Sequence, residues 1–293
     1  MWFQEFVIFV VRVNPMPEQP PTVVLICHED DRLDTEGLAS WLASTMRLVG
    51  LVIIRDDGRR KWRSARREIR RVGWLGFADV GAFRLYARLL LARRDEAWKA
   101  RELARLRLRY PADLEGVPRV FVSDPNTEET HQFLARLGPD LAIARCKFIL
   151  KPAIFRLARV GTFVLHPGVC PEYRNAHGCF WALANRDLDR VGMTLLRIDE
   201  GVDTGPVYLH ATCPIDEVHE SHTVIQYRVV LENLDAIGRR LTEIAAARGA
   251  VAPIPTAGRR SATWGQPRLT DYLRWKWLAR RSNRDTDRVV AVP

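Results

Sequence analysis

The segment Phe163–Gly178 reads FVLHPGVCPEYRNAHG and holds two histidines, two prolines and one cysteine between two apolar runs. Its first histidine, His166, ends an apolar run and is followed at once by Pro167 and Gly168, so the chain leaves the sheet there. Open α/β sheets bind their ligands outside the carboxyl ends of their strands. The segment therefore predicts a strand that delivers His166 to a functional cleft.

Short apolar runs alternate with helical patterns along the rest of the chain. The predicted strands are Thr22–Cys27, Leu48–Ile54, Arg119–Asp124, Asp140–Arg145, Thr162–His166, Gly192–Asp199 and Pro206–Cys213. Continuous apolar strands separated by amphipathic helices are typical of a parallel sheet that is covered on both faces. The sequence predicts a doubly wound, mostly parallel α/β domain over residues 21–215.

A helical extension with a basic tail is predicted over residues 216–293. A long helix from about Thr223 to Gly249 is indicated by a capping-box pair, Thr223 and Gln226, and by an apolar stripe with helical spacing. A short final helix and a tail are expected beyond it.

Several classes of function are disfavoured. The turn after the first strand reads CHEDDRLD, whose acids would repel a pyrophosphate, and no G-x-G-x-x-G is present there. The five cysteines form no C-x-x-C pair, which indicates neither a disulfide framework nor a zinc site, and we expect a reducing cytoplasm. The histidines of HESH, His219 and His222, lie three residues apart rather than four as in H-E-x-x-H, so no metal is expected.

The formal net charge of +10 is concentrated in one part of the chain. The segment Arg55–Arg71 carries nine Lys or Arg against three acidic residues, and Arg101–Tyr110 adds further arginines. We interpret residues 55–110 as a solvated pair of helices over a face of the sheet. A tRNA or another phosphate-bearing partner is the alternative.

The first fifteen residues, MWFQEFVIFVVRVNP, contain an apolar run far shorter than the roughly 20 residues of a membrane span. They have no basic start and no small-residue cleavage site, so they do not match a targeting signal. We interpret residues 1–20 as a leader, expect translation to begin at Met16, and expect no membrane partner. A short membrane-surface anchor is the alternative.

A second loop with ligand-like residues, IDEGVDTGPV, spans Ile198–Val207 and places Asp203 just before another predicted strand. Two loops at the same edge of a sheet can meet, which would bring Asp203 within reach of His166. A histidine beside a carboxylate is the arrangement that tunes a general base near neutral pH.

Three ordered motifs together resemble the formyltransferase family, which includes glycinamide ribonucleotide, methionyl-tRNA and sugar N-formyltransferases. They are PDLAIARCKFILKP, LHPGVCPEYRNAHGCFWAL and GMTLLRIDEGVDTGPV, within Asp124–Val207. The resemblance implies transfer of a formyl group from 10-formyltetrahydrofolate to an amine. A formyltetrahydrofolate hydrolase and a non-catalytic folate-binding homologue are the alternatives.

The resemblance also bears on the acceptor. After Asp203 only ninety residues remain, and they predict a long helix rather than a run of short strands. We therefore expect no β-barrel of the kind that methionyl-tRNA formyltransferases append, and we expect a small-molecule amine as the partner rather than a tRNA.

The resemblance implies roles for the residues that stand at the family's motif positions. His166 matches the catalytic histidine of the family, as general base and stabiliser of the reacting oxygen, and Asp203 matches the aspartate that orients it. The pterin walls correspond to Phe148, Ile149, Leu150, Asp199, Glu200, Gly201 and Val202.

One residue departs from the family pattern: Val164 stands two positions before His166, where the family has an asparagine. Loss of one donor to a developing oxyanion typically costs on the order of 10²- to 10³-fold in rate. One interpretation is that Asn175 supplies the amide from the loop after His166, here called the acceptor loop (residues 167–178), in which Arg174 and His177 would contact the acceptor. Alternatively, Asn175 adopts a positive-φ turn in place of glycine, and His177 caps or packs.

Overall fold

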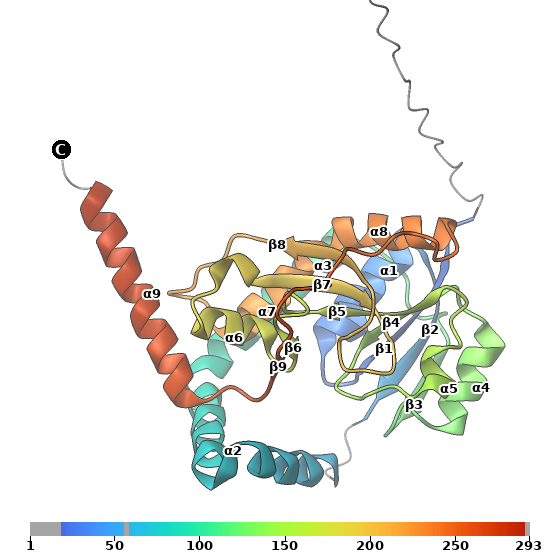
Figure 1. Ribbon diagram of the computed structural model, residues 1–293. Coiled ribbons are helices and arrows are strands. Elements are labelled where there is room, and N and C mark those ends of the chain that lie inside the picture. The colour runs from blue at the N-terminus through green and yellow to red at the C-terminus, as the bar shows by residue number, and fades with distance from the viewer. Residues whose placement is uncertain (1–18, 56–58, 291–293) are drawn as a thin grey trace, which may run out of the picture.

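The computed structural model describes residues 19–55 and 59–290, and the expected leader lies mostly outside them. Seven strands form one sheet in the order β3-β2-β1-β4-β5-β7-β8 (Figure 1). Strands β1 to β5 of this sheet pair in parallel, while β7 is antiparallel to both β5 and β8. The strands are β1 (Thr22–His28), β2 (Arg47–Ile54), β3 (Arg119–Val122), β4 (Leu141–Arg145), β5 (Gly161–His166), β7 (Gly192–Arg197) and β8 (Val207–Thr212). The predicted doubly wound, mostly parallel fold is confirmed.

Both faces of the sheet are covered, as continuous apolar strands require. Alternate residues of β1 enter two different apolar clusters: Val23 and Leu25 point to one face, and Val24 and Ile26 to the other. The first face carries η1 (Leu33–Leu38), α1 (Ala39–Thr45), α6 (Gly178–Ala184), α7 (His222–Leu231) and α8 (Leu234–Ala246). The second carries α4 (Glu128–Leu137) and α5 (Pro152–Phe155).

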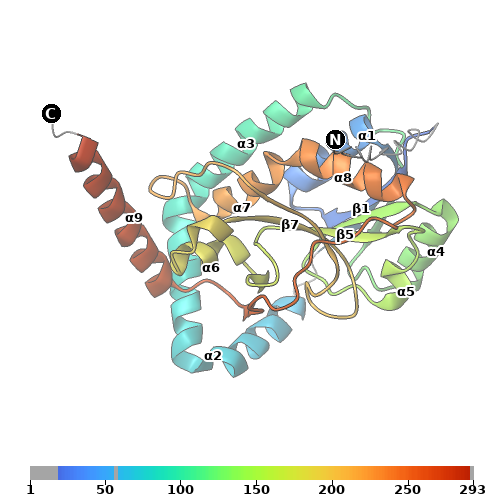
Figure 2. The same ribbon diagram turned by 45° about the horizontal axis from the view of Figure 1, so that its top comes forward.

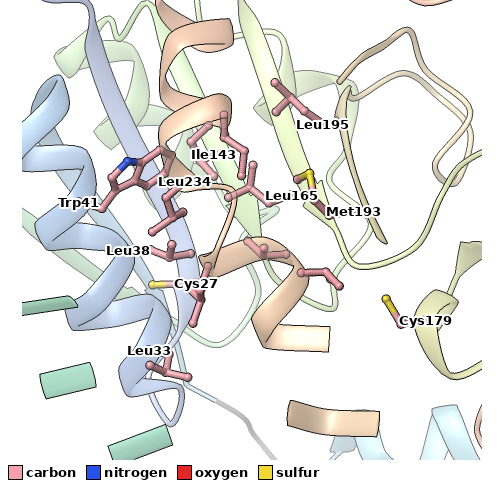
Figure 3. Close-up of a cluster of buried hydrophobic side chains, with 14 of the residues drawn as sticks. Cys27, Leu33, Leu38, Trp41, Ile143, Leu165, Cys179, Met193, Leu195 and Leu234 are labelled. Carbon is pink, nitrogen blue, oxygen red and sulfur yellow. The ribbon is translucent and has the colours of Figure 1, made fainter. Parts of the chain in front are cut away.

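The larger cluster lies on the first face. Trp41 of α1, Leu165 of β5 and Leu234 of α8 are at most 1% exposed and gather with their neighbours between the helices and the sheet (Figure 3). Since α7 and α8 complete this core, the first part of the predicted extension packs directly on the sheet. The proposed domain boundary at residue 215 stays a prediction.

The predicted single helix from Thr223 to Gly249 is wrong. The chain forms α7 and α8 with a break between them, where the Asn233 side chain donates to the carbonyl of Val229 at 2.9 Å. Asparagine competes in this way with the helical backbone. The predicted capping box is also wrong, because Ser221 caps α7 by accepting from Val224 N at 3.2 Å.

The basic insertion forms α2 (Arg59–Tyr86), η2 (Ala87–Leu91) and α3 (Ala92–Arg109). Helix α3 packs against η1, α1 and α7 and adds Leu103 and Leu106 to the core. Helix α2 bends at Gly73, whose φ is +72°, and packs against α9 (Leu269–Val290) rather than on the sheet (Figure 2). The prediction that both helices cover a sheet face is therefore wrong for α2.

The chain after α8 crosses back toward the loop that follows β5. A two-stranded parallel pair, β6 (Arg174–Asn175) and β9 (Thr263–Trp264), joins the two segments. Helix α9 then spans 22 residues, longer than the short final helix expected. A further single turn, η3 (Leu188–Arg190), precedes β7. Among the described residues, no helix is long and apolar enough to cross a membrane.

Candidate active site

The loop after His166 folds back on itself with almost no space inside it. A β-carbon on Gly168 would lie 2.8 Å from Gly178 Cα and 2.9 Å from His166 Nε2. Gly178 is equally constrained, since its β-carbon would lie 2.7 Å from Gly168 Cα. The two glycines therefore allow the acceptor loop to turn directly beside the histidine.

Thr194 anchors this loop to the sheet. It lies on β7 opposite His166 and is completely buried. Its hydroxyl donates to Gly168 O at 2.7 Å and accepts from Cys170 N at 3.0 Å. Both hydrogen-bonding capacities of the hydroxyl are thus used to hold the backbone that follows His166.

His166 is held by contacts at both ring nitrogens. It is 5% exposed, and its Nε2 donates to Tyr173 O at 2.8 Å. Its Nδ1 lies 3.6 Å from Asp203 Oδ2, which is an electrostatic contact longer than a hydrogen bond. The sequence-based expectation that the two loops meet agrees with this geometry.

The surroundings favour the charged imidazolium. Burial alone would lower the pKa of His166, but the Asp203 carboxylate, the Cys170 thiol and the Tyr173 carbonyl outweigh burial and raise the pKa to about 10. His166 is then protonated at neutral pH, and both ring nitrogens are donors.

The loop from Asp199 to Thr204 holds Asp203 in place. Asp203 adopts a φ of +51°, and its Oδ2 accepts from Asn175 N at 2.7 Å. Asp199 closes the loop, because its Oδ1 accepts from Gly201 N at 3.0 Å and from Thr204 Oγ1 at 2.7 Å. The carboxylate of Asp203 is therefore positioned before any ligand binds.

Asn175 has the geometry of a turn residue. Its φ is +74°, and its side-chain amide donates to Trp264 O at 2.5 Å. The neighbouring Arg174 donates to Val202 O at 3.0 Å and to Thr263 Oγ1 at 3.2 Å. Both side chains thus join the acceptor loop to β9 and to the Asp203 loop.

The comparisons with known proteins point to one family. Residues 118–241 match the family model described as formyl transferase. Over 132 residues the chain is 31% identical to the methionyl-tRNA formyltransferase of Chlorobium chlorochromatii, covering 45% of this chain and 41% of that protein. Over 159 residues it is 24% identical to the GDP-perosamine N-formyltransferase of Brucella melitensis, covering 51% of this chain and 61% of that protein.

Residues 118–241 belong to the formyltransferase family. The fold is also similar to that of a solved structure. The crystal structure of phosphoribosylglycinamide formyltransferase from Anaplasma phagocytophilum superposes with a TM-score of 0.51 at 14% identity, over 85% of this chain and all of that one. The chain spans about half the length of the curated relatives that it matches.

Val164 lies on the same face of β5 as His166 in this formyltransferase domain. Its side chain packs against the second apolar cluster and against a small cluster of Cys170, Leu196 and Val207. The side-chain amide of an asparagine at this position would therefore contact the apolar side chains of these two clusters.

The residues predicted to form the walls of the pterin site differ in how exposed their side chains are. Ile149 is 62% exposed, whereas Leu150 is buried in the second apolar cluster. Phe148 is half-buried and stacks on His28 with ring centroids 6.1 Å apart. Glu200 is exposed and pairs with Arg156 at 2.8 Å. Within the Phe148–Leu150 segment, Ile149 and Phe148 thus have apolar side-chain surface to offer.

His177 precedes α6 with a φ of +58° and lies beside His222, with ring centroids 5.8 Å apart. Burial lowers the pKa of His177 to about 4 and also lowers the pKa of His222. The Nδ1 atoms of both rings are buried and have no hydrogen-bond partner. His219, the other histidine of HESH, instead pairs with Asp216 at 2.8 Å.

A buried ion pair lies next to this site at the ends of β1 and β4. Arg145 donates to Leu165 O at 2.8 Å and lies 3.2 Å from Asp34 Oδ1. Burial raises the pKa of Asp34 to about 7, although Arg145 opposes the shift. Within the described residues, no group of three or more His, Cys, Asp or Glu is placed to hold a metal.

Three supporting residues were not found from the sequence. They are Thr194, Arg145 and Trp264, which stacks between Tyr173 and Trp181 at 5.6 and 5.0 Å. A threonine in an apolar strand was a visible signal for Thr194, but nothing local marked Trp264.

Proposed function

We propose that this protein transfers a formyl group from 10-formyltetrahydrofolate to the amine of a small molecule. The observation that carries the proposal is the contact between His166 and Asp203, 3.6 Å apart at the carboxyl edge of the sheet. Support also comes from the family match, which includes both residues.

His166 acts as a hydrogen-bond donor in this proposal. A histidine with a pKa of about 10 cannot take a proton at neutral pH, so we replace the general-base role expected from the sequence. Its imidazolium stabilises the formyl oxygen as that oxygen becomes negative, and a charged donor is stronger than a neutral one. Because Nε2 is bound to Tyr173 O, Nδ1 is the nitrogen available.

Asp203 accepts the proton that the amine loses when its nitrogen bonds to the formyl carbon. That proton leaves with the donor when the bond to its N10 nitrogen breaks, so protons and electrons balance. The backbone bond from Asn175 N holds the carboxylate in position for this step. We assign Asn175 the role of a positioning residue through its backbone rather than that of a substitute amide.

The donor would lie between the Phe148–Leu150 segment and the Asp199–Val202 loop. The exposed Ile149 and half-buried Phe148 offer apolar surface for a pterin ring. Backbone groups of the Asp199–Val202 loop can pair with its polar edge. The residues therefore fit this donor, which supplies the activated formyl group.

The acceptor would lie beside His177, in the loop that follows β5. Both terminal nitrogens of Arg174 are already bonded within the protein, so we assign Arg174 to loop support rather than to acceptor binding. The unpaired Nδ1 of His177 can bond a neutral polar group such as a hydroxyl.

The test is incubation of the full chain with 10-formyltetrahydrofolate, labelled in the formyl group, and pools of small-molecule amines. Mass spectrometry then follows formylated amines and free formate. A labelled amide that disappears with His166→Ala supports the proposal. Formate release without an acceptor would identify a hydrolase, and folate binding without turnover would identify a non-catalytic homologue.

A further inference from the structure

We propose that the outer face of α2, η2 and α9 binds the surface of an anionic lipid bilayer. This face, here called the α2–α9 face, comprises the exposed apolar residues of these elements and the arginines around them. Figure 1 shows α2 and α9 at one side of the molecule, away from the sheet. The inference does not depend on formyl transfer, and it departs from the sequence-based expectation of no membrane partner.

Helix α2 and the turn η2 that continues it expose several large apolar side chains. Trp74 is 74% exposed and Leu75 is 90% exposed, directly after the bend at Gly73. Leu85, Leu89 and Leu90 are 58%, 70% and 62% exposed. Single exposed apolar residues are ordinary, but such a group on one continuous helical segment marks an interaction site.

Part of this surface forms a stripe along α2. At about 100° per residue, Trp74, Ala78, Ala82 and Leu85 fall within about 80° of one another, and all four are exposed. Val80 and Phe83 are buried on the opposite side, where Phe83 packs on Tyr272 of α9. Helix α2 thus has one apolar side in the protein and a second one in solvent.

The charge around the stripe is positive. Between residues 66 and 94 the sequence has eight arginines and two acidic residues, Glu68 and Asp79. Asp79 faces α9, where it accepts from Leu269 N at 2.9 Å and from Thr270 Oγ1 at 2.5 Å. Glu68 is buried and pairs with Arg71. Neither carboxylate is free to offset the exposed arginines.

The exposed apolar surface of η2 continues onto α9 at a groove of about 480 Å³. Leu90, Leu273 and Trp277 line it together with Arg94 and Arg280. Two carboxylates, Asp95 and Glu220, also line it, but Asp95 is buried and Glu220 pairs with Arg228. Leu273 and Trp277 are 46% and 58% exposed and lie one turn apart. Apolar anchors ringed by arginines are the composition of helices that lie in a membrane interface.

A bilayer fits this face better than the other possible occupants. Nucleic acid would use the arginines but would leave Leu85, Leu89 and Leu90 in water. A second copy would bring two strongly positive faces together, which charge repulsion opposes. Anionic headgroups match the arginines, while the acyl boundary accepts the tryptophans and leucines.

The test is co-sedimentation of the full chain with phosphatidylcholine vesicles that contain or lack phosphatidylglycerol. We expect binding to the anionic vesicles only, weakened by salt. The variant Leu85→Ser/Leu89→Ser should bind at least about tenfold more weakly. Arg88→Gln and Arg93→Gln should each weaken binding about fivefold.

Leu108→Ser is the matched control, because Leu108 is 85% exposed on α3, outside the face, and its replacement should change nothing. Equal melting temperatures will show that the variants fold. Absence of binding to anionic vesicles at low salt would overturn the inference, as would undiminished binding of the leucine variant. Light scattering that shows a dimer dissociated by Leu85→Ser/Leu89→Ser would identify the face as a contact between copies instead.

Discussion

Replacement of Asp203 by asparagine should lower the pKa of His166 toward that of an ordinary histidine. The carboxylate Oδ2 lies 3.6 Å from Nδ1, and both side chains are largely buried. At an effective dielectric constant of about 20, two unit charges at this separation attract by about 4 to 5 kcal/mol. That energy equals roughly a thousandfold change in the acid dissociation constant of the imidazolium.

The assay is an NMR titration of the imidazole nitrogens in ¹⁵N-histidine protein. The chain has seven histidines, so His166→Gln identifies the signal of His166. In the wild type this ring should stay protonated up to a pH of about 10, and in Asp203→Asn it should lose its proton far earlier. Glu200→Gln is the control, since Glu200 is exposed and pairs with Arg156 instead.

The same change has a signed effect on stability. The pKa of folded His166 lies above its unfolded value of about 6.5, so the pair stabilises the fold fully below that pH and loses its effect as pH rises through about 10. Asp203→Asn should therefore be less stable than the wild type at pH 6, by up to about 4 kcal/mol, with a gap that closes toward pH 10. A wild-type His166 that titrates near pH 6.5, or one unaffected by Asp203→Asn, would refute the reasoning.

Further changes test the rest of the site by formyl-transfer assays and thermal unfolding. His166→Ala should abolish transfer, and it should also lower the melting temperature because the pair with Asp203 is lost. Asn175→Ala should lose about 1 kcal/mol of stability at its positive φ, whereas Asn175→Gly should retain both fold and activity. Thr194→Val should cost about 1 to 3 kcal/mol and lower kcat, because two buried hydrogen bonds disappear. Val164→Asn should raise the rate if an oxyanion donor is lacking, and unchanged or lower activity would count against that shortage.

The fold was predictable because burial on both faces leaves a strong local signal. Thr22–Cys27 and Thr162–His166 were predicted within one residue of β1 and β5, and the strand does end at His166. The break between α7 and α8 left a weaker trace. It depends on one asparagine, Asn233, inside an otherwise regular apolar stripe.

The residues of the candidate site could be predicted only where they lie in a motif that resembles the formyltransferase family. The positions of His166 and Asp203 follow from the formyltransferase resemblance, and their roles stay predictions. Trp264 could not be found, because it reaches Glu172 O from 92 residues away along the chain. The bend at Gly73 is likewise visible as a glycine, but the direction that it gives α2 depends on packing against α9.

Val164 and the charge of His166 both affect how strongly the site can stabilise a negative charge on the formyl oxygen. Where the formyltransferase resemblance implies an asparagine that donates to the reacting oxygen, this chain has an apolar side chain packed against Cys170 and Leu196. A neutral amide is the weaker type of donor, whereas an imidazolium forms charge-assisted hydrogen bonds that are about twice as strong. Asp203 raises the pKa of His166, so in the proposed reaction a greater share of oxyanion stabilisation would depend on this one pair. It follows that Asp203→Asn should reduce the rate by more in the wild type than in Val164→Asn, where a second donor is restored.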